Sequence, residues 1–245
     1  MKYDWSLLVP QWKALCASGF SEGISRSEEL PCVGDALCLL LGAPKGETPP
    51  CVVPAIGAFT LHLNDASHWH SFQSRAAGLY RLGLAQIGSQ GIISKEAFLQ
   101  QLAPLLIRRI LPCLFREVFP EVPSCLAAAT RCEQEGTGEA ASAAQQASPV
   151  TNPSVSAGWE AWVVATYAVK TADIVRHPAS RAADYLGSYA AAIAVRAASA
   201  VSYLPQAEFL DPEKYLRLGA ELAVESLVNL QSPGAEALTY LTEAG

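Results

Sequence analysis

The residues best suited to chemistry lie close together in the first third of the chain. Three of the four histidines fall between residues 62 and 70, beside an Asn-Asp pair. Imidazole nitrogens and carboxylate oxygens are ligands for zinc, nickel or iron. One hypothesis is therefore a divalent transition-metal site made of His62, Asp65, His68 and His70. A polar ligand site without metal is a second hypothesis for the same segment.

The helices expected around this segment argue against a metal site. Asn64 and Asp65 are typical of a helix end, and Ser67 is expected to cap the next helix. His68 and His70 would then lie about 200° apart around that helix and could not face one ion. If they instead precede the helix in an extended turn, they share a side and could chelate. We favour helix capping, with surface histidines around a buried Trp69.

A polar cleft at the same junction is an alternative to simple capping. A short polar pair between two apolar helices is most often a cap. The Asp65 carboxylate could instead lie in a cleft opposite Arg75 or Arg81. Asn64, Asp65 and Arg75 are therefore candidate binding residues.

A second candidate surface is basic. Arg109 and Arg116 are seven positions apart and share a helix face, and Arg108 lies within about 100° of them. Arginine grips carboxylates and phosphates through paired hydrogen bonds, so these three residues could bind an anion or an acidic partner. The alternative is a solvated face whose arginines pair with Glu117 or Glu121.

Common catalytic motifs are absent from the sequence. We find no phosphate-binding loop, no G-x-G-x-x-G after a strand, no H-E-x-x-H and no G-x-S-x-G. The sequence therefore favours a non-catalytic protein without a cofactor. A helical metal-dependent enzyme or a small-ligand-binding protein, with its site at Asn64–His70, remains the alternative.

The composition narrows the possible partners. Charged residues make up 16% of the chain, against roughly 25% in an ordinary soluble domain, so the protein is either core-heavy or hides part of its surface against a partner. The net charge of −6 argues against nucleic acid, whose binding depends on basic side chains. A protein partner or self-association is expected. No segment combines the length and apolarity of a membrane span, so membrane contact is not expected.

The cysteines and the N-terminal residues indicate the compartment. The seven cysteines include no C-x-x-C pair and fit neither a disulfide framework nor a zinc ribbon. We expect reduced thiols that act as small apolar core residues. The first residues lack the apolar core of a secretory signal. The expected location is the cytoplasm.

Helical patterns run through most of the chain and set the fold class. Leucine and isoleucine recur at helical spacing from Phe98 to Val118, although Pro104 and Pro112 should kink or divide that helix. The run from Trp159 to Leu204 is rich in alanine, which predicts closely packed helices. Asp211-Pro212-Glu213 is a strong helix start. The predicted fold is all-α, a compact multi-helix bundle with an Ala-rich C-terminal half.

A polar, small-residue stretch divides the sequence. Residues 133–156 contain Gln, Gly, Ser and Pro without an apolar face, which predicts a disordered linker or insertion. It separates an N-terminal helical region, 1–132, from the Ala-rich region, 157–245. We expect the two regions to pack as one body. The function expected is that of a helical interaction or regulatory protein acting through protein–protein contacts.

Overall fold

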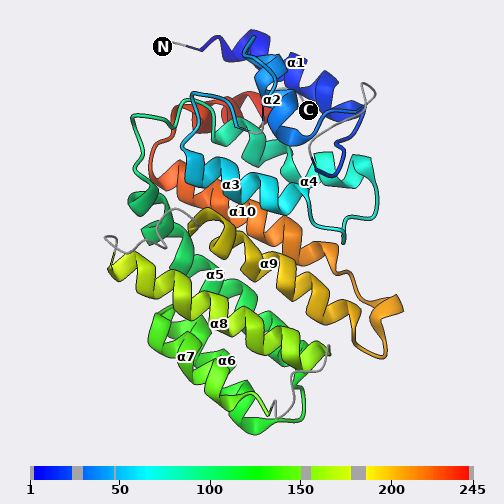
Figure 1. Cartoon of the computed structure of the whole chain (residues 1–245), viewed down its shortest axis with the longest axis vertical. Helices are drawn as coiled ribbons and strands as arrows, with labels where there is room; N and C mark the ends of the chain where they lie inside the picture. The colour runs from blue at the N-terminus through cyan, green and yellow to red at the C-terminus, as the bar shows by residue number, and fades with distance from the viewer. Residues whose placement is uncertain (1–2, 24–29, 47, 150–155, 178–185, 243–245) are drawn as a thin grey trace. The chain divides into compact units, whose positions relative to one another are not determined.

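The computed structural model describes residues 3–23, 30–46, 48–149, 156–177 and 186–242. Over these residues the chain is all-α, as the sequence predicts, with eleven α-helices, short 3-10 turns and no strand (Figure 1). It forms two compact units, Met1–Phe98 with Ala220–Gly245, and Leu99–Gly219. These units differ from the regions expected on either side of residues 133–156. The boundaries fall inside two helices, α5 (Lys95–Val118) and α10 (Glu213–Asn229).

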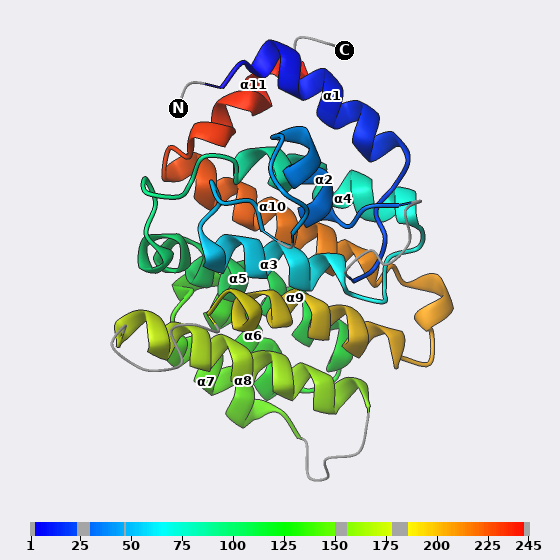
Figure 2. The ribbon, with the colours of Figure 1, turned by 45° about the horizontal axis from the view of Figure 1, so that its top comes forward.

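The first unit brings the two ends of the chain together. Its N-terminal helices are α1 (Trp5–Ala17), α2 (Val33–Leu40), α3 (Pro54–Asn64) and α4 (Phe72–Ala85). Its C-terminal elements are η3 (Pro233–Leu238) and α11 (Thr239–Thr242). Helix α1 contacts α4, η3 and α11, and η3 also contacts α4 (Figure 2). Residues far apart in the sequence can therefore line one site.

Close contacts hold η3 against the end of α4. The Ser232 hydroxyl donates to the Ala85 carbonyl oxygen at 2.7 Å. A Cβ atom on Gly234 would lie 2.1 Å from the Leu84 carbonyl oxygen, so a larger residue cannot fit without a backbone shift. Trp12 of α1 is fully buried, and its indole donates to the Tyr80 carbonyl oxygen at 2.9 Å. These contacts hold both α1 and η3 against α4.

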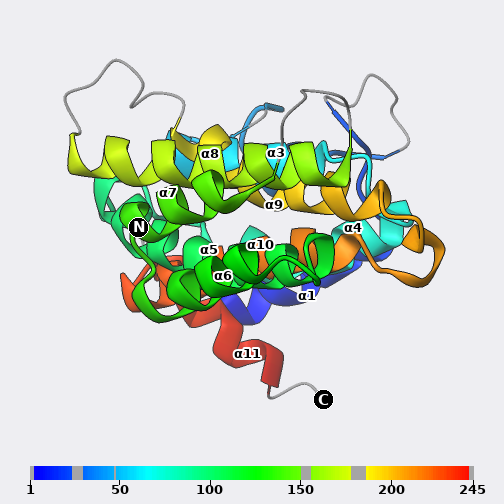
Figure 3. The same cartoon turned by 90° about the horizontal axis from the view of Figure 1, so that it is seen from below.

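The second unit contains α6 (Pro123–Glu135), α7 (Gly138–Ala147), α8 (Ala157–Arg176), α9 (Leu186–Ser202) and η2 (Ala207–Phe209). Helices α6, α7, α8 and α9 contact one another in sequence order, and α7 lies along α8 (Figure 3). The α8 and α9 faces that pack together are rich in buried alanine, including Ala161, Ala165, Ala194 and Ala198. The predicted close packing of Ala-rich helices is confirmed.

Helix α7 corrects the expectation of a disordered segment for residues 138–147. Thr137 caps this helix by accepting a hydrogen bond from the Ala140 N–H at 3.2 Å. Gly138, Ala140, Ala141 and Ala144 are buried. A Cβ atom on Gly138 would lie 2.9 Å from the Cβ of Ala172 on α8, so the two helices approach closely there. The small residues of α7 thus form a buried apolar face, contrary to the expectation that this stretch has none. Residues 150–155 lie outside the described part.

Helix α5 is continuous through both of its prolines. Pro104 and Pro112 lie inside the helix, so they do not divide it. The expectation that no segment has both the length and the apolarity of a membrane span was wrong, because among the described residues α5 alone is long and apolar enough to cross a membrane. Of its apolar window, 61% is buried within the protein, as in the core helix of a soluble protein.

The seven cysteines are free, and five of them are buried. Cys51 is partly exposed and Cys113 is exposed. Burial raises the pKa of the Cys16 and Cys132 thiols to about 12. The predicted role of cysteine as a small apolar core residue therefore holds for the five buried thiols.

Candidate functional site

The Asn64–His70 segment is a helix junction, but its cap is not the expected one. Ser71, not Ser67, caps α4, and it forms a reciprocal capping box with Ser74. His68 and His70 therefore precede α4 in the connecting turn. Ser67 lies in the turn before Trp69, whose indole donates to the Leu63 carbonyl oxygen at 2.8 Å.

The histidines of this segment have different surroundings. His62 and His70 are exposed, whereas His68 is partly buried. Burial lowers the pKa of His68, and its Nδ1 atom is buried without a hydrogen bond from or to the described residues. Among the described residues, no group of three His, Cys, Asp or Glu side chains is arranged to hold a metal ion.

Asn64 and Asp65 tie the α3–α4 junction to the loop after α1. Asn64 is fully buried, and its amide donates to the Ser21 carbonyl oxygen at 2.9 Å. It also donates to Asp65 Oδ1, which accepts the Gly23 N–H at 2.9 Å. The Asn64 side-chain oxygen accepts the Val33 N–H at the start of α2. These contacts make the pair a structural anchor between three chain segments.

Arg75 belongs to the same anchor. It is 4% exposed, and its guanidinium donates to the Phe20 carbonyl oxygen at 3.0 Å. Burial lowers the pKa of Arg75, while the carboxylates of Glu22 and Asp65 raise it. The structure therefore brings Asn64, Asp65 and Arg75 together, but their polar groups are directed at the protein's own backbone. Arg81 does not face Asp65; it pairs with Glu221 of α10.

The arginines of α5 are divided between structural contacts and solvent. Arg108 donates to the Glu135 carbonyl oxygen at the end of α6, at 3.0 Å. Arg116 pairs with Glu133 of α6 at 2.5 Å. The expected partners were Glu117 and Glu121; Glu117 instead binds Lys214 and Tyr215. Arg109 is exposed and makes no hydrogen bond with the described residues, so the three arginines do not converge.

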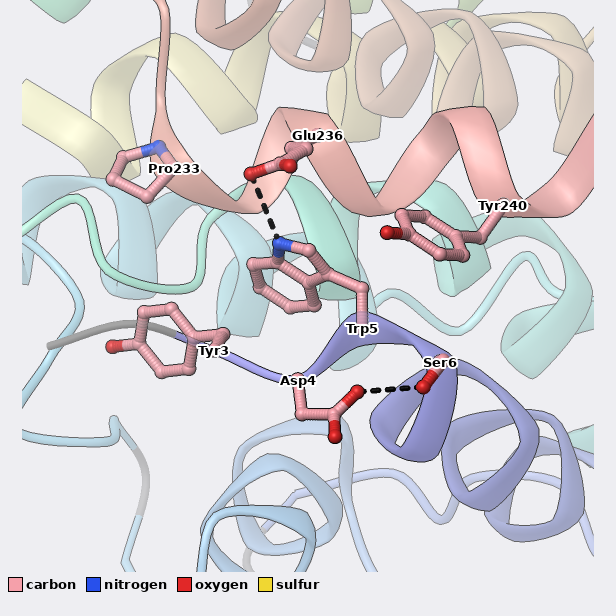
Figure 4. Close-up of a pocket in the computed structure, with 7 residues that line it drawn as sticks. All are labelled: Tyr3, Asp4, Trp5, Ser6, Pro233, Glu236 and Tyr240. Atoms are coloured by element: carbon pink, nitrogen blue, oxygen red, sulfur yellow. Dashed lines mark hydrogen bonds between the residues drawn. The ribbon is translucent and has the colours of Figure 1, made fainter.

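A polar pocket opens where the N-terminal segment meets the C-terminal elements of the first unit. Its volume is about 450 Å³. Three aromatic side chains, Tyr3, Trp5 and Tyr240, and two carboxylates, Asp4 and Glu236, account for most of its lining (Figure 4). Ser6 and Pro233 complete it. No Lys or Arg is among these described lining residues, so the two carboxylates set the charge of the pocket.

Hydrogen bonds fix the side chains around this pocket. The Trp5 indole nitrogen donates to Glu236 Oε2 at 3.3 Å, and the Ser6 hydroxyl donates to Asp4 Oδ1 at 2.6 Å (Figure 4). Tyr3 stacks on Trp5, with their ring centroids 5.0 Å apart. Figure 4 shows the Tyr240 hydroxyl directed toward Trp5. Burial, followed by the interaction with Cys51, raises the pKa of Tyr3 to about 12, so this phenol stays neutral at physiological pH.

An apolar groove lies next to the polar pocket and shares Tyr3 and Asp4 with it. Its volume is about 380 Å³. Most of its lining comes from α1, the end of α2 and the following loop: Leu7, Leu8, Leu40, Leu41, Pro49 and Pro50. Leu7 is 57% exposed, although it is a large apolar side chain. The segment Tyr3–Leu8 thus separates a polar from an apolar hollow.

Comparison of the chain with protein-family models, curated proteins and solved structures gives no match. The site must therefore be interpreted from its own chemistry.

Sequence reasoning did not identify either hollow. Tyr3, Asp4 and Trp5 could be identified as an aromatic and acidic start to the first helix. However, no local pattern pairs them with Glu236 and Tyr240, more than 200 positions away. Only the packing of η3 and α11 against α1 brings these residues together.

Proposed function

We propose that this protein is a non-catalytic helical interaction protein that binds a segment of a partner protein in the apolar groove beside Tyr3. The observation that carries the proposal is the apolar groove itself, where Leu7 is 57% exposed beside the partly exposed Leu8 and Leu41, because contiguous exposed apolar surface often marks a binding site. A reduced cytoplasmic location agrees with the free cysteines.

The charge around the groove selects the kind of partner segment. Asp4 lies at its edge, and its described lining contains no Lys or Arg. The best match is a segment that presents leucine-like side chains to the groove and a basic residue to Asp4. Apolar burial would supply most of the affinity, and the charge would favour one orientation.

The experiment uses short fluorescent peptides with leucines on one helical face and lysines beside them. We expect the full-length protein to bind this peptide, and to bind less well a peptide with glutamates in place of the lysines. Leu7→Gln should weaken binding about tenfold, equivalent to about 1.4 kcal/mol. Leu39→Gln is the matched control, because Leu39 is 64% exposed but does not line the groove.

Two results would contradict the proposal. Equal weakening by Leu7→Gln and Leu39→Gln would show that the peptide does not select the groove. A concentration-dependent dimer that Leu7→Gln abolishes would assign the groove to a second copy of the chain in place of a different partner.

A further inference from the structure

The polar pocket has the chemistry of a receptor for an organic cation. Ammonium groups bind to the faces of aromatic rings through the ring quadrupole, and Trp and Tyr are the strongest partners. Trp5, Tyr3 and Tyr240 come from the two ends of the first unit and line one hollow of about 450 Å³. This volume would accept a small molecule or the end of a long side chain.

The two carboxylates add negative charge to the aromatic lining. Glu236 is held in place by the Trp5 indole, and Asp4 by the Ser6 hydroxyl. Both carboxylates are exposed at the pocket, and neither is balanced by a basic residue in the described lining. An inorganic cation would gain little from the rings, and a neutral apolar ligand would gain little from the carboxylates. A cation with an alkyl surface would gain from both the aromatic rings and the carboxylates.

We propose that the pocket formed by Tyr3, Asp4, Trp5, Glu236 and Tyr240 binds an alkylammonium group. Trp5 lies between Tyr3 and Tyr240 in the lining of the pocket (Figure 4). Glu236 and Asp4 lie on opposite sides of Trp5 in Figure 4 and supply the negative charge of the described lining. The group could belong to a free small molecule or to a lysine side chain, because both present the same chemistry. This inference rests on the residues of the polar pocket, of which Tyr3 and Asp4 also line the apolar groove.

The Trp5 indole N–H gives a direct signal for the test. The chain contains five tryptophans, and a Trp5→Phe variant assigns the Trp5 resonance in the ¹H–¹⁵N spectrum. Choline is titrated into the full-length protein, and its neutral isostere 3,3-dimethylbutan-1-ol is the control. We expect choline to shift the Trp5 resonance to saturation and the isostere to cause little change. An equal response to both compounds, or to neither, would overturn the proposal.

Two variants locate the charge effect. Glu236→Gln keeps an acceptor for the Trp5 indole but removes the charge, and should weaken choline binding about fivefold or more. Glu225→Gln makes the same change on an exposed residue of α10 that does not line the pocket, and should have no effect. Tyr240→Leu should also weaken binding. Unchanged affinity in both Glu236→Gln and Tyr240→Leu, with unchanged melting, would reject this site.

A final pair of titrations distinguishes the two sources of the group. Choline represents a free small molecule, and peptides with one lysine or one trimethyllysine represent a protein side chain. Tighter binding of a peptide than of choline assigns the pocket to a protein partner, and the reverse order assigns it to a small molecule. Weaker binding of all three cations than of the neutral isostere would again overturn the proposal.

Discussion

The Trp5 indole nitrogen donates a hydrogen bond to Glu236 Oε2 across 3.3 Å, and this contact joins residues 231 positions apart in the sequence. Trp5 lies in the first turn of α1, and Glu236 lies in η3. The contact links the two ends of the chain and forms one wall of the polar pocket. The candidate site is therefore also a place where the first unit is stabilised.

Replacing Trp5 should destabilise the protein far more than replacing its hydrogen-bond partner. Trp5→Ala removes a side chain that is 4% exposed, and should lower the free energy of unfolding by about 3 kcal/mol. Glu236→Gln retains an acceptor and should change it by less than about 0.5 kcal/mol. Urea denaturation checks both values, and similar losses in the two variants would contradict the buried position of Trp5.

Asn64 should prove to be a structural residue. Asn64→Ala leaves the Ser21 carbonyl and the Val33 N–H without their partner, and should cost about 2 kcal/mol of unfolding free energy. The measurement is thermal melting followed by circular dichroism. A variant with wild-type stability would mean that Asn64 is free for the binding role that its sequence position suggested.

The two serines of the α3–α4 connection provide a matched test of the helix start. Ser71→Ala removes the capping box of α4 and should lower the free energy of unfolding by about 1 kcal/mol. Ser67→Ala, at the cap that the sequence predicts, should have little effect because Ser67 is exposed outside the helix. Urea titrations of both variants test this prediction. A larger loss of unfolding free energy in Ser67→Ala than in Ser71→Ala would place the start of α4 at Ser67.

Gly138→Val tests the close approach of α7 to α8. The added atoms would meet Ala172, and we expect a loss of about 1–3 kcal/mol from overpacking. Hydrogen exchange should become faster in α7. Gln146→Ala, at an exposed position of the same helix, should leave the exchange unchanged. Rapid exchange of α7 in the wild-type protein would instead agree with the disordered segment that composition predicts.

Alkaline pH should destabilise the protein through its buried thiols. The pKa of Cys16 and Cys132 is raised to about 12 in the folded state, against about 8.5 in an unfolded chain. Between these values the folded state holds protons that the unfolded state releases, so the free energy of unfolding falls as pH rises. The fall should reach about 1 kcal/mol per pH unit for each thiol.

The control for this effect is an exposed cysteine. Cys132→Ala should make the pH dependence shallower in urea denaturation between about pH 8 and pH 10. Cys113→Ala should keep the wild-type slope, because Cys113 is exposed. A common slope for the two variants would show that burial of Cys132 does not control the pH dependence.

The sequence by itself determined the helical class and several helix ends. Apolar residues at helical spacing predict α5, and Ser94, just before the helix, accepts the Ala97 N–H at 3.0 Å. The Asp211-Pro212-Glu213 signal lies where α10 begins. These features depend on neighbours three or four positions apart, which is the distance over which a helix forms its own contacts.

Only the tertiary structure decided which side chains meet. Alanine and glycine in residues 138–147 form a helix because α8 packs against them, and composition without that neighbour resembles a linker. Arg75 becomes an internal anchor because the Phe20 carbonyl lies beside it. Tyr3 and Tyr240 line one pocket because η3 and α11 pack on α1. Such contacts depend on packing between distant segments, and no local pattern in the sequence encodes them.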